Sequence, residues 1–398
     1  MLEQLQIKQQ HQVEVKMSEL AAMIKEEISR QGPMTFARFM ELALYHPVWG
    51  YYSTATAIGP HGDFYTVSNT GELFGSMLAR QFDEMWRHCG CPEHWWLVEY
   101  GPGSGALARD VLATIGANFQ DLYQAVNYYL IEISPELRKK QQDTLLATPY
   151  ADKCKWVDDI AKIAPTSGIT GCIYGNELID AFPVHLVTAG DAELNELYVD
   201  CNGTEFYFQN GPLSTANLAD YFKRQGVQLG KGQRAEANLQ ARDWLAHTAA
   251  NLARGFIVII DYGFTALEMY APQRFNGTLR CYYRHSLIDD PLINIGHQDI
   301  TANVNFSVLA DWAREAGLDL LGLVTQPDFL LNLGILDTFR GQADFHLTPE
   351  IQKKTAAIKQ LLLPGGMSGI FKVLALVKGL STTPKLAGFK ARNILGSP

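Results

Sequence analysis

The sequence predicts an α/β protein whose mostly parallel sheet is covered by helices on both faces. From residue 95 onward, short apolar runs alternate with helical stretches, which is typical of parallel strands joined by crossover helices. The runs are continuously apolar, as expected for strands buried on both faces. A glycine-rich turn joins the first run to the helix that follows it. The other parts are an N-terminal helical segment and an α+β insertion.

Three helices are expected before the sheet begins, over residues 18–31, from Thr35 to a stop at His46-Pro47, and over residues 72–86. Ser18 and Thr35 are the expected N-caps, because their hydroxyl groups can accept a backbone N–H of the first helical turn. The apolar residues of each segment recur three and four positions apart, which favours helices with one buried face.

The expected strands of the sheet are residues 95–100, 128–133, 155–157, 172–174 and 256–260, with helices over 106–115 and 135–146. Two further strands are expected near the C-terminus, over residues 318–325 and 371–377. They are expected to pair as an antiparallel hairpin at the edge of the otherwise parallel sheet.

The insertion is expected between the fourth and fifth strands, over residues 185–254. It contains two apolar runs, 197–199 and 206–208, separated by Asn202-Gly203. Asn-Gly between such runs favours a hairpin with a two-residue turn. The chain is therefore divided into an N-terminal segment, residues 1–94, and a sheet domain, residues 95–398, that carries the insertion.

The composition excludes several classes of protein. Of the 398 residues, 47% are hydrophobic and 19% charged, which suits a globular chain with a sizeable core. The net charge of −9 and the lack of a basic run argue against nucleic acid as a partner. No apolar run is long enough to span a bilayer, and the N-terminus lacks a targeting pattern, so we expect a cytoplasmic protein.

The six cysteines and ten histidines show no repeated spacing of metal ligands. Cys89 and Cys91 are the one close cysteine pair, and no second pair follows at a fixed distance. We therefore expect no metal site.

The glycine turn contains Gly101, Gly103 and Gly105 between a strand and a helix. Glycines at this place let the backbone approach a bound nucleotide closely. The pattern also satisfies the dinucleotide fingerprint, which expects an acidic residue about 20 positions further on. The acid at the end of the second strand, Glu132, stands 31 positions after Gly101. It can still accept hydrogen bonds from two ribose hydroxyl groups.

A second acid, Glu99, precedes the glycines. A carboxylate there attracts a cationic amino-acid group but repels a pyrophosphate, which favours S-adenosylmethionine over NAD. The plain alternative is a glycine turn that only packs strand against helix.

With these motifs, the chain resembles the MidA-like family of S-adenosylmethionine-dependent methyltransferases, which includes mitochondrial complex I assembly-factor methyltransferases. The resemblance runs from about Ile28 to Ile335. The matching stretches are Tyr45–Tyr52, Gly62–Phe64, Leu97–Gly105, Asn176–Val184, Asp261–Gly263, Gly277–Tyr282 and Asp299–Phe306. One stretch departs from the family: Ser68-Asn69-Thr70-Gly71-Glu72 stands where members usually have Ser-Pro-Glu.

The resemblance implies a class I, Rossmann-like methyltransferase fold with a seven-stranded sheet and a reversed last strand. It also implies protein arginine as the methyl acceptor, and hence a protein partner. The oligomeric state is left open, with a homodimer as one alternative. Three alternatives to arginine methylation stay open: a non-catalytic assembly or chaperone protein, an NAD-linked oxidoreductase, and a methyltransferase with a small-molecule acceptor.

The expected cofactor-binding residues surround the glycine turn and the ends of the neighbouring strands: Asp63, Glu99, Gly101, Gly103, Gly105, Glu132, Ile133, Asp159 and Asn176. Asp63 lies in a Gly- and Pro-rich loop that could act as a lid, although a turn aspartate is the alternative. Asp158 and Asp159 end the third strand, where an acid can reach the adenine amino group. A solvated pair of loop residues is the alternative there.

Glu177, Asp180 and Asp261 are the catalytic candidates. Glu177 and Asp180 follow the fourth strand, where ligands of open α/β sheets bind. Two carboxylates can hold the planar fork of an arginine, and one of them can accept the proton lost on methylation. Asp180 could instead stabilise a turn, and Asp261, which ends the fifth strand, could instead cap a helix.

Overall fold

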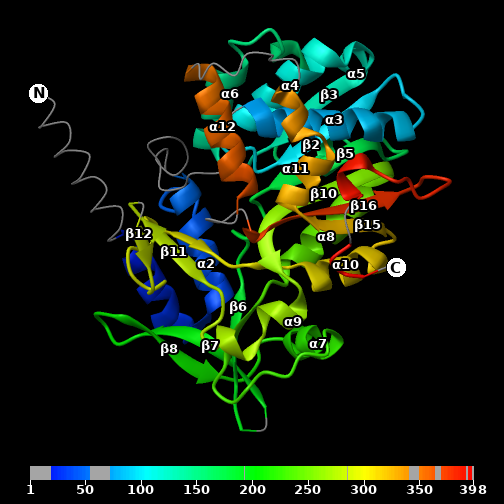
Figure 1. Ribbon diagram of the computed structural model, residues 1–398. Coiled ribbons are helices and arrows are strands. Elements are labelled where there is room, and N and C mark those ends of the chain that lie inside the picture. The colour runs from blue at the N-terminus through cyan, green and yellow to red at the C-terminus, as the bar shows by residue number, and fades with distance from the viewer. Residues whose placement is uncertain are drawn as a thin grey trace, which may run out of the picture. The chain divides into compact units, whose positions relative to one another are not determined.

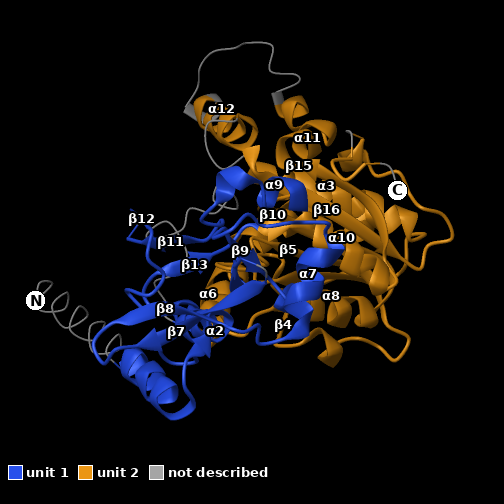
Figure 2. Cartoon of the chain, turned by 90° about the horizontal axis from the view of Figure 1, so that it is seen from below, with its two compact units in different colours: residues 1–64, 180–241, 266–303 blue, residues 65–179, 242–265, 304–398 orange. Residues whose placement is uncertain are grey.

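The computed structural model describes residues 19–53, 72–191, 193–284, 286–339, 349–363, 369–390 and 393–396. The chain forms two compact units, coloured separately in Figure 2. Unit 1 comprises residues 1–64, 180–241 and 266–303, and unit 2 comprises 65–179, 242–265 and 304–398. Unit 1 therefore combines residues 1–64 with most of the insertion, whereas residues 65–94 belong to unit 2.

Unit 2 is built on a sheet with the strand order β15-β16-β10-β5-β2-β3-β4 (Figure 1). The strands are β2 (Trp95–Tyr100), β3 (Val126–Ile131), β4 (Cys154–Val157), β5 (Ile169–Asn176), β10 (Leu252–Phe264), β15 (Asp319–Thr325) and β16 (Phe371–Lys378), and β14 (Val304–Asn305) pairs with β10. The strands from β10 to β4 are parallel, whereas β16 runs antiparallel to both β10 and β15.

This sheet confirms the predicted fold class and the reversed last strand. The predicted antiparallel pair at the edge of the sheet is present as β15 and β16, but residues 326–370 connect the two strands, so they do not form a tight hairpin. β16 inserts between β10 and β15, so the reversed strand is interior and β15 is the edge strand. The burial of β16 explains its place, because all of its residues except Lys378 are buried.

Helices cover both faces of this sheet, as the apolar strands predict. The helices of unit 2 are α3 (Glu72–His88), α4 (Ala106–Asn118), α5 (Gln120–Ala125), α6 (Pro135–Leu145), α8 (Gln240–Asn251), α10 (Phe306–Glu315), α11 (Gln326–Asn332) and α12 (Pro349–Leu362). Phe82 of α3 packs on Tyr174 of β5, with ring centroids 5.1 Å apart. On the opposite face, Trp244 of α8 packs on Tyr100 of β2, with ring centroids 5.5 Å apart.

Unit 1 contains a helix over residues 19–31 and two small sheets. Its other elements are β1 (Met34–Thr35), α2 (Phe36–Tyr45), β6 (His185–Ala189), β7 (Leu194–Cys201), β8 (Phe206–Gly211), α7 (Ala216–Arg224), β9 (Arg234–Ala237), α9 (Ala266–Met269), β11 (Arg280–Tyr283), β12 (Ser286–Ile288) and β13 (Asp299–Thr301). One sheet has the order β1-β7-β6-β9, with β8 paired to β7, and the other has the order β12-β11-β13.

Local signals explain the helical part of unit 1. The Thr35 hydroxyl accepts the backbone N–H of Arg38 at 3.2 Å, which confirms the predicted N-cap of α2. Leu20 and Ile24 of the first helix are fully buried, as is Phe39 of α2, in one apolar cluster. The predicted Ser18 cap lies outside the described residues.

The hairpin of the insertion is present, but its predicted two-residue turn is wrong. Cys201 pairs with Phe206, so four residues, 202–205, connect β7 and β8. The Asn202 side chain accepts the backbone N–H groups of Thr204 and Glu205, at 3.2 and 3.0 Å. This side-chain turn lengthens the loop and leaves Gly203 with φ of +96°.

Within the part of the chain that the structure describes, none of the helices combines the length and the apolar character needed to span a membrane.

Candidate active site

The glycine turn lies at the carboxyl end of β2 and leads directly into α4. All three glycines have left-handed backbone conformations, with φ of +60° at Gly101, +54° at Gly103 and +78° at Gly105. Other residues adopt this conformation at a cost of roughly 1–2 kcal/mol. A Cβ atom on Gly101 would also lie 3.0 Å from the Leu178 side chain, and one on Gly105 would lie 3.2 Å from the Gln141 backbone. The turn therefore requires glycine for both its shape and its packing.

The acid at the end of the next strand, Glu132, is held beside this turn. Its side chain accepts the Ser134 backbone N–H at 2.8 Å through Oε1, and the Gln141 amide at 2.9 Å through Oε2. Burial raises the pKa of Glu132, while these hydrogen bonds lower it. Each carboxylate oxygen keeps a second lone pair, so ribose hydroxyl groups can still donate to it.

Gln141 is a site residue that the sequence reasoning missed. Its side-chain amide donates to the Gly103 carbonyl oxygen at 3.0 Å as well as to Glu132, so it ties the glycine turn to the carboxylate. The available signal was its place between Leu137 and Leu145, four residues from each. A polar residue on the apolar stripe of a helix is fully buried here and therefore needs polar partners.

Ile133 differs from most large apolar residues of unit 2, because 66% of its surface is exposed. It follows Glu132 directly at the carboxyl end of the sheet. An exposed apolar side chain beside a carboxylate suits the flat face of a base next to its ribose.

Glu99 points into the sheet face that α3 covers. It is 2% exposed, and its Oε2 accepts the Tyr128 hydroxyl group at 2.7 Å. Tyr128 is also hydrogen-bonded to the hydroxyl group of Tyr174. Burial raises the pKa of Glu99 to about 7, although the hydrogen bonds from the tyrosines oppose this shift. The carboxyl group is therefore balanced between its neutral and charged forms near neutral pH.

Asn176 is the last residue of β5, and Glu177 follows it. Glu177 has φ of +51°, which is uncommon for a residue with a side chain, and its N–H donates to the Ile260 carbonyl at 2.9 Å. The Asn176 amide donates to Glu177 Oε1 at 3.3 Å. The other amide atom, Asn176 Oδ1, is buried and has no hydrogen-bond partner among the described residues. It is an acceptor available to a ligand.

Asp261 holds this segment in place. It is fully buried in the carboxyl-terminal part of β10, and its Oδ2 accepts the backbone N–H groups of Leu178 and Ile179 at 3.2 and 3.0 Å. Its Oδ1 accepts the N–H of Tyr262 at 2.9 Å. Through these hydrogen bonds the Asp261 carboxylate fixes the backbone that follows Glu177. This role differs from the helix cap that was its alternative.

The remaining candidates are Asp159, Asp63 and Asp180. Asp159 accepts the Ala161 N–H at 2.7 Å and the His247 ring at 2.9 Å, so its carboxylate already has two protein partners. Its pKa is lowered, chiefly by the Ala161 backbone hydrogen bond. Asp63 lies outside the described residues, as do residues 68–71, and Asp180 belongs to unit 1.

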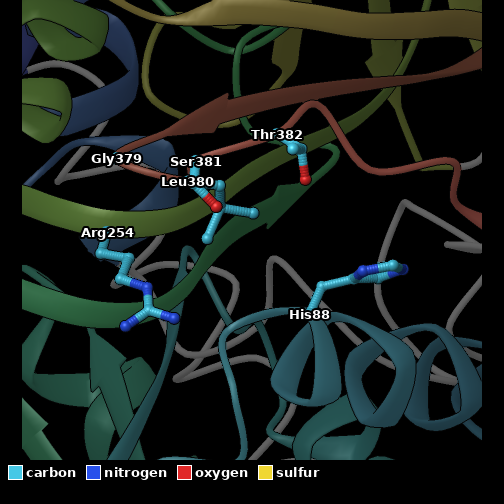
Figure 3. Close-up of a pocket in the computed structure, with 6 residues that line it drawn as sticks. All are labelled: His88, Arg254, Gly379, Leu380, Ser381 and Thr382. Carbon is cyan, nitrogen blue, oxygen red and sulfur yellow. The ribbon is translucent and has the colours of Figure 1, made fainter.

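A polar cavity of about 340 Å³ lies at the other end of the unit 2 sheet (Figure 3). His88 is the last residue of α3 and Arg254 lies near the start of β10, and both line the cavity with residues 379–382. Arg254 and Asp261 are seven residues apart on one strand, which corresponds to roughly 23 Å. The cavity is therefore not part of the group around the glycine turn.

These features define a class of protein: an α/β fold with a glycine turn at the carboxyl edge of its sheet, where nucleotide-like cofactors bind in such folds. Residues 77–324 match the family described as S-adenosyl-L-methionine-dependent methyltransferases, and the chain belongs to this family.

The relatives agree with this assignment. The chain is 32% identical to a Burkholderia thailandensis protein whose crystal structure is bound to S-adenosyl-homocysteine, with a TM-score of 0.85 over 96% of this chain and 97% of that one. It is 26% identical to the mitochondrial protein arginine methyltransferase NDUFAF7 homolog of Drosophila melanogaster, covering 91% of this chain and 85% of the relative. The Mus musculus NDUFAF7 is 28% identical, with coverage of 78% and 72%.

The chain is therefore a methyltransferase whose cofactor is S-adenosylmethionine, as the glycine turn and the family resemblance predict. The residues present fit that cofactor, since Asn176 Oδ1 offers an unused acceptor to an ammonium group. The expected cytoplasmic location is corrected, because these curated relatives are named as mitochondrial proteins.

Proposed function

We propose that this chain transfers a methyl group to an arginine side chain of a protein partner. The names of the Drosophila and mouse relatives, both protein arginine methyltransferases, support this acceptor. The observation that carries the proposal is the conformation of Glu177, a carboxylate held at positive φ at the carboxyl edge of the sheet. Such strained residues concentrate at functional sites.

Four groups of unit 2 hold the cofactor in this proposal. The backbone of Gly101 and Gly103 approaches it closely, and Glu132 accepts the ribose hydroxyl groups. Ile133 packs on the adenine, and Asn176 Oδ1 accepts the ammonium group. The pKa of Glu99 is about 7. The positive charge of a bound cofactor favours the charged form of this carboxyl group, so Glu99 then supplies negative charge near the turn.

Bound S-adenosylmethionine supplies an electrophilic methyl group, whose bond to sulfur breaks with the electron pair left on sulfur as the bond to an arginine nitrogen forms. Glu177 orients that nitrogen and accepts the proton that it loses, then releases the proton to water. Asp261 is a positioning residue, because it acts by fixing the backbone of Leu178 and Ile179. Asp159 is left as a stabiliser of its own loop.

The test is transfer of a labelled methyl group from S-adenosylmethionine into proteins of a cell lysate, followed by hydrolysis and identification of the labelled amino acid. We expect labelled methylarginine, and we expect Glu177→Gln to lower the rate by about 10²- to 10⁴-fold without weakening S-adenosyl-homocysteine binding. Glu205→Gln, in the exposed β7–β8 connection, is the matched control.

Two outcomes would contradict the proposal. Label in a small molecule or in another amino acid would reject arginine as the acceptor. Binding of S-adenosyl-homocysteine without any methyl transfer would favour a non-catalytic assembly protein that keeps the cofactor.

A further inference from the structure

Distant segments of the sequence meet inside unit 1. The Tyr52 hydroxyl group donates to Asp299 Oδ1 at 2.9 Å, although the two residues are 247 positions apart. The Tyr45 hydroxyl group donates to the Ala181 carbonyl at 2.8 Å, and the Ala302 N–H donates to the Asp180 carbonyl at 2.9 Å. Each of these residues lies in a stretch that resembles the family, and none has a role in the glycine turn.

Aromatic rings form one side of this meeting point. The rings of Tyr45 and Tyr52 are stacked, with centroids 5.4 Å apart and planes inclined by 30°. Tyr282 of β11 stands opposite Asp299 of β13 in the antiparallel register, so both side chains lie on the same face of their sheet. The faces of tyrosine rings attract cations.

Two buried carboxylates supply negative charge at the same place. Asp180 is 3% exposed and Asp299 is 2% exposed. The pKa of Tyr52 is raised well above its ordinary value, first by burial and then by Asp299, with a smaller contribution from Asp180. Burial also raises the pKa of Tyr282, whereas Arg280 lowers it by more than either carboxylate raises it. At Tyr52, the two carboxylates therefore favour a nearby positive group.

Thr301 adds an unused polar atom. It is 1% exposed, and its hydroxyl group has no hydrogen-bond partner among the described residues. It lies two positions after Asp299 on β13, so both side chains point to the same face. A buried polar group without a partner costs about 1–3 kcal/mol, and a ligand that donates a hydrogen bond would remove this cost.

We propose that these side chains bind the guanidinium group of the methyl acceptor. They form the tyrosine–carboxylate cluster, which consists of Tyr45, Tyr52, Tyr282, Asp180, Asp299 and Thr301. This assignment rests on the proposed function for the identity of the acceptor.

The chemistry of the cluster selects a guanidinium group over other cations. Guanidinium is planar, presents five N–H donors in a fork and stacks on aromatic rings, whereas the lysine ammonium group is a compact and strongly hydrated charge. A bound metal ion is a poorer match, because no three His, Cys, Asp or Glu side chains of the described residues gather to hold one.

The probe for this proposal is Nα-acetyl-arginine amide, titrated into the whole protein in the presence of saturating S-adenosyl-homocysteine. The citrulline counterpart keeps the planar shape of the arginine side chain but has no charge. The lysine counterpart keeps the charge but has no planar group. We expect both counterparts to bind at least about ten-fold more weakly than the arginine probe, a difference of about 1.4 kcal/mol.

Two nearly isosteric variants locate the binding site. Asp299→Asn removes one charge but keeps an acceptor for Tyr52, and we expect it to weaken the arginine probe about ten-fold. Thr301→Val removes a hydroxyl group that has no partner among the described residues, so stability should not fall, yet the probe should bind about five-fold more weakly. Asp289→Asn, an exposed aspartate in the same unit, is the control and should bind the probe as the unmodified protein does.

The outcomes separate this proposal from the proposed function. Methylarginine production together with unchanged probe affinity in Asp299→Asn and Thr301→Val would overturn the cluster as the acceptor site and leave the function standing. Equal binding of the arginine and citrulline probes would overturn it as well. Probe binding that depends on the cluster, without methylarginine in the lysate assay, would support a guanidinium site and reject the proposed function.

Discussion

The glycine turn of unit 2 presents backbone to its ligand, whereas the tyrosine–carboxylate cluster of unit 1 presents side chains. The turn is formed by a few consecutive residues, from Glu99 to Ala106, and its shape comes from three positive φ angles. The cluster is formed by side chains from four separated segments of the chain. The comparison teaches that a cofactor shared by many enzymes can be held by a local motif, while an individual acceptor requires tertiary structure.

The two regions also differ in whether their buried polar groups have hydrogen-bond partners. In unit 2, the buried carboxylate of Asp261 is satisfied by three backbone N–H groups and stabilises the segment after Glu177. In unit 1, the buried Thr301 hydroxyl group has no partner among the described residues. Satisfied buried groups position other residues, and unsatisfied ones indicate where a ligand is expected.

The largest expected effect follows from removing the Asp261 carboxylate. Asp261→Ala leaves the N–H groups of Leu178, Ile179 and Tyr262 without their acceptor, and we expect the free energy of unfolding to fall by about 4 kcal/mol. Asp261→Asn keeps one acceptor atom and should lose about half as much. Urea denaturation measures both values. Equal stability of the alanine variant and the unmodified protein would remove Asp261 from its positioning role.

A slightly smaller effect is expected from Glu99. Its pKa is about 7 in the folded protein and about 4.5 when unfolded, so the folded state binds the extra proton between these values. The stability that this proton contributes is full below pH 4.5 and is lost as the pH rises through 7. The loss is about 3 kcal/mol, at about 1.4 kcal/mol for each pKa unit.

Glu99→Gln removes this titration, so the variant should gain stability relative to the unmodified protein as the pH rises from 4.5 to 7.5. Urea denaturation at several pH values measures the difference. Glu205→Gln, which is exposed, should follow the unmodified protein throughout. Parallel curves of stability against pH for Glu99→Gln and the unmodified protein would show that burial does not raise the pKa of Glu99.

The glycine turn itself is tested by Gly103→Val. A β-branched residue at φ of +54° distorts the turn, and we expect S-adenosyl-homocysteine affinity to fall about 100-fold, or about 2.7 kcal/mol. Gly203→Val is the matched control, because Gly203 has a positive φ in the exposed hairpin with no atom near its Cβ position. Calorimetric titration should show a loss in the first variant alone. Full affinity in Gly103→Val would separate the turn from the cofactor.

The smallest expected effect concerns Gln141. Gln141→Leu continues the apolar stripe of α6 but removes the hydrogen bonds to the Gly103 carbonyl and to Glu132. We expect S-adenosyl-homocysteine to bind about ten-fold more weakly while the variant stays folded. Unchanged affinity would mean that Glu132 keeps its position without this partner.

The parts of the fold that depend on residues close together in the sequence could be predicted from it. The strand 95–100 and the turn after it agree with β2 and the start of α4, because glycine spacing and apolar runs act locally. The strand around residues 256–260 extends over Leu252–Phe264, since partners on both sides prolong its pairing. The interior place of β16 depends on such partners, which the order of the chain does not show.

Three site candidates could be chosen from the sequence for the same reason. Glu132, Asn176 and Glu177 stand at or just after the ends of apolar strands, and local patterns indicate these ends. The contact of Tyr52 with Asp299 joins residues 247 positions apart, and no local pattern encodes it. Asp261 is a catalytic candidate in the sequence because it follows the apolar run 256–260, but the sequence does not show that backbone N–H groups donate to both of its oxygens.

The proposal that the glycine turn binds the cofactor and the tyrosine–carboxylate cluster binds the acceptor is tested most directly by measuring two affinities in two variants. S-adenosyl-homocysteine and Nα-acetyl-arginine amide are titrated separately into folded Gly103→Val and Asp299→Asn. We predict that Gly103→Val weakens binding of the first ligand alone and that Asp299→Asn weakens binding of the second alone. Loss of both ligands in either variant, or of neither in both, would contradict separate cofactor and acceptor sites.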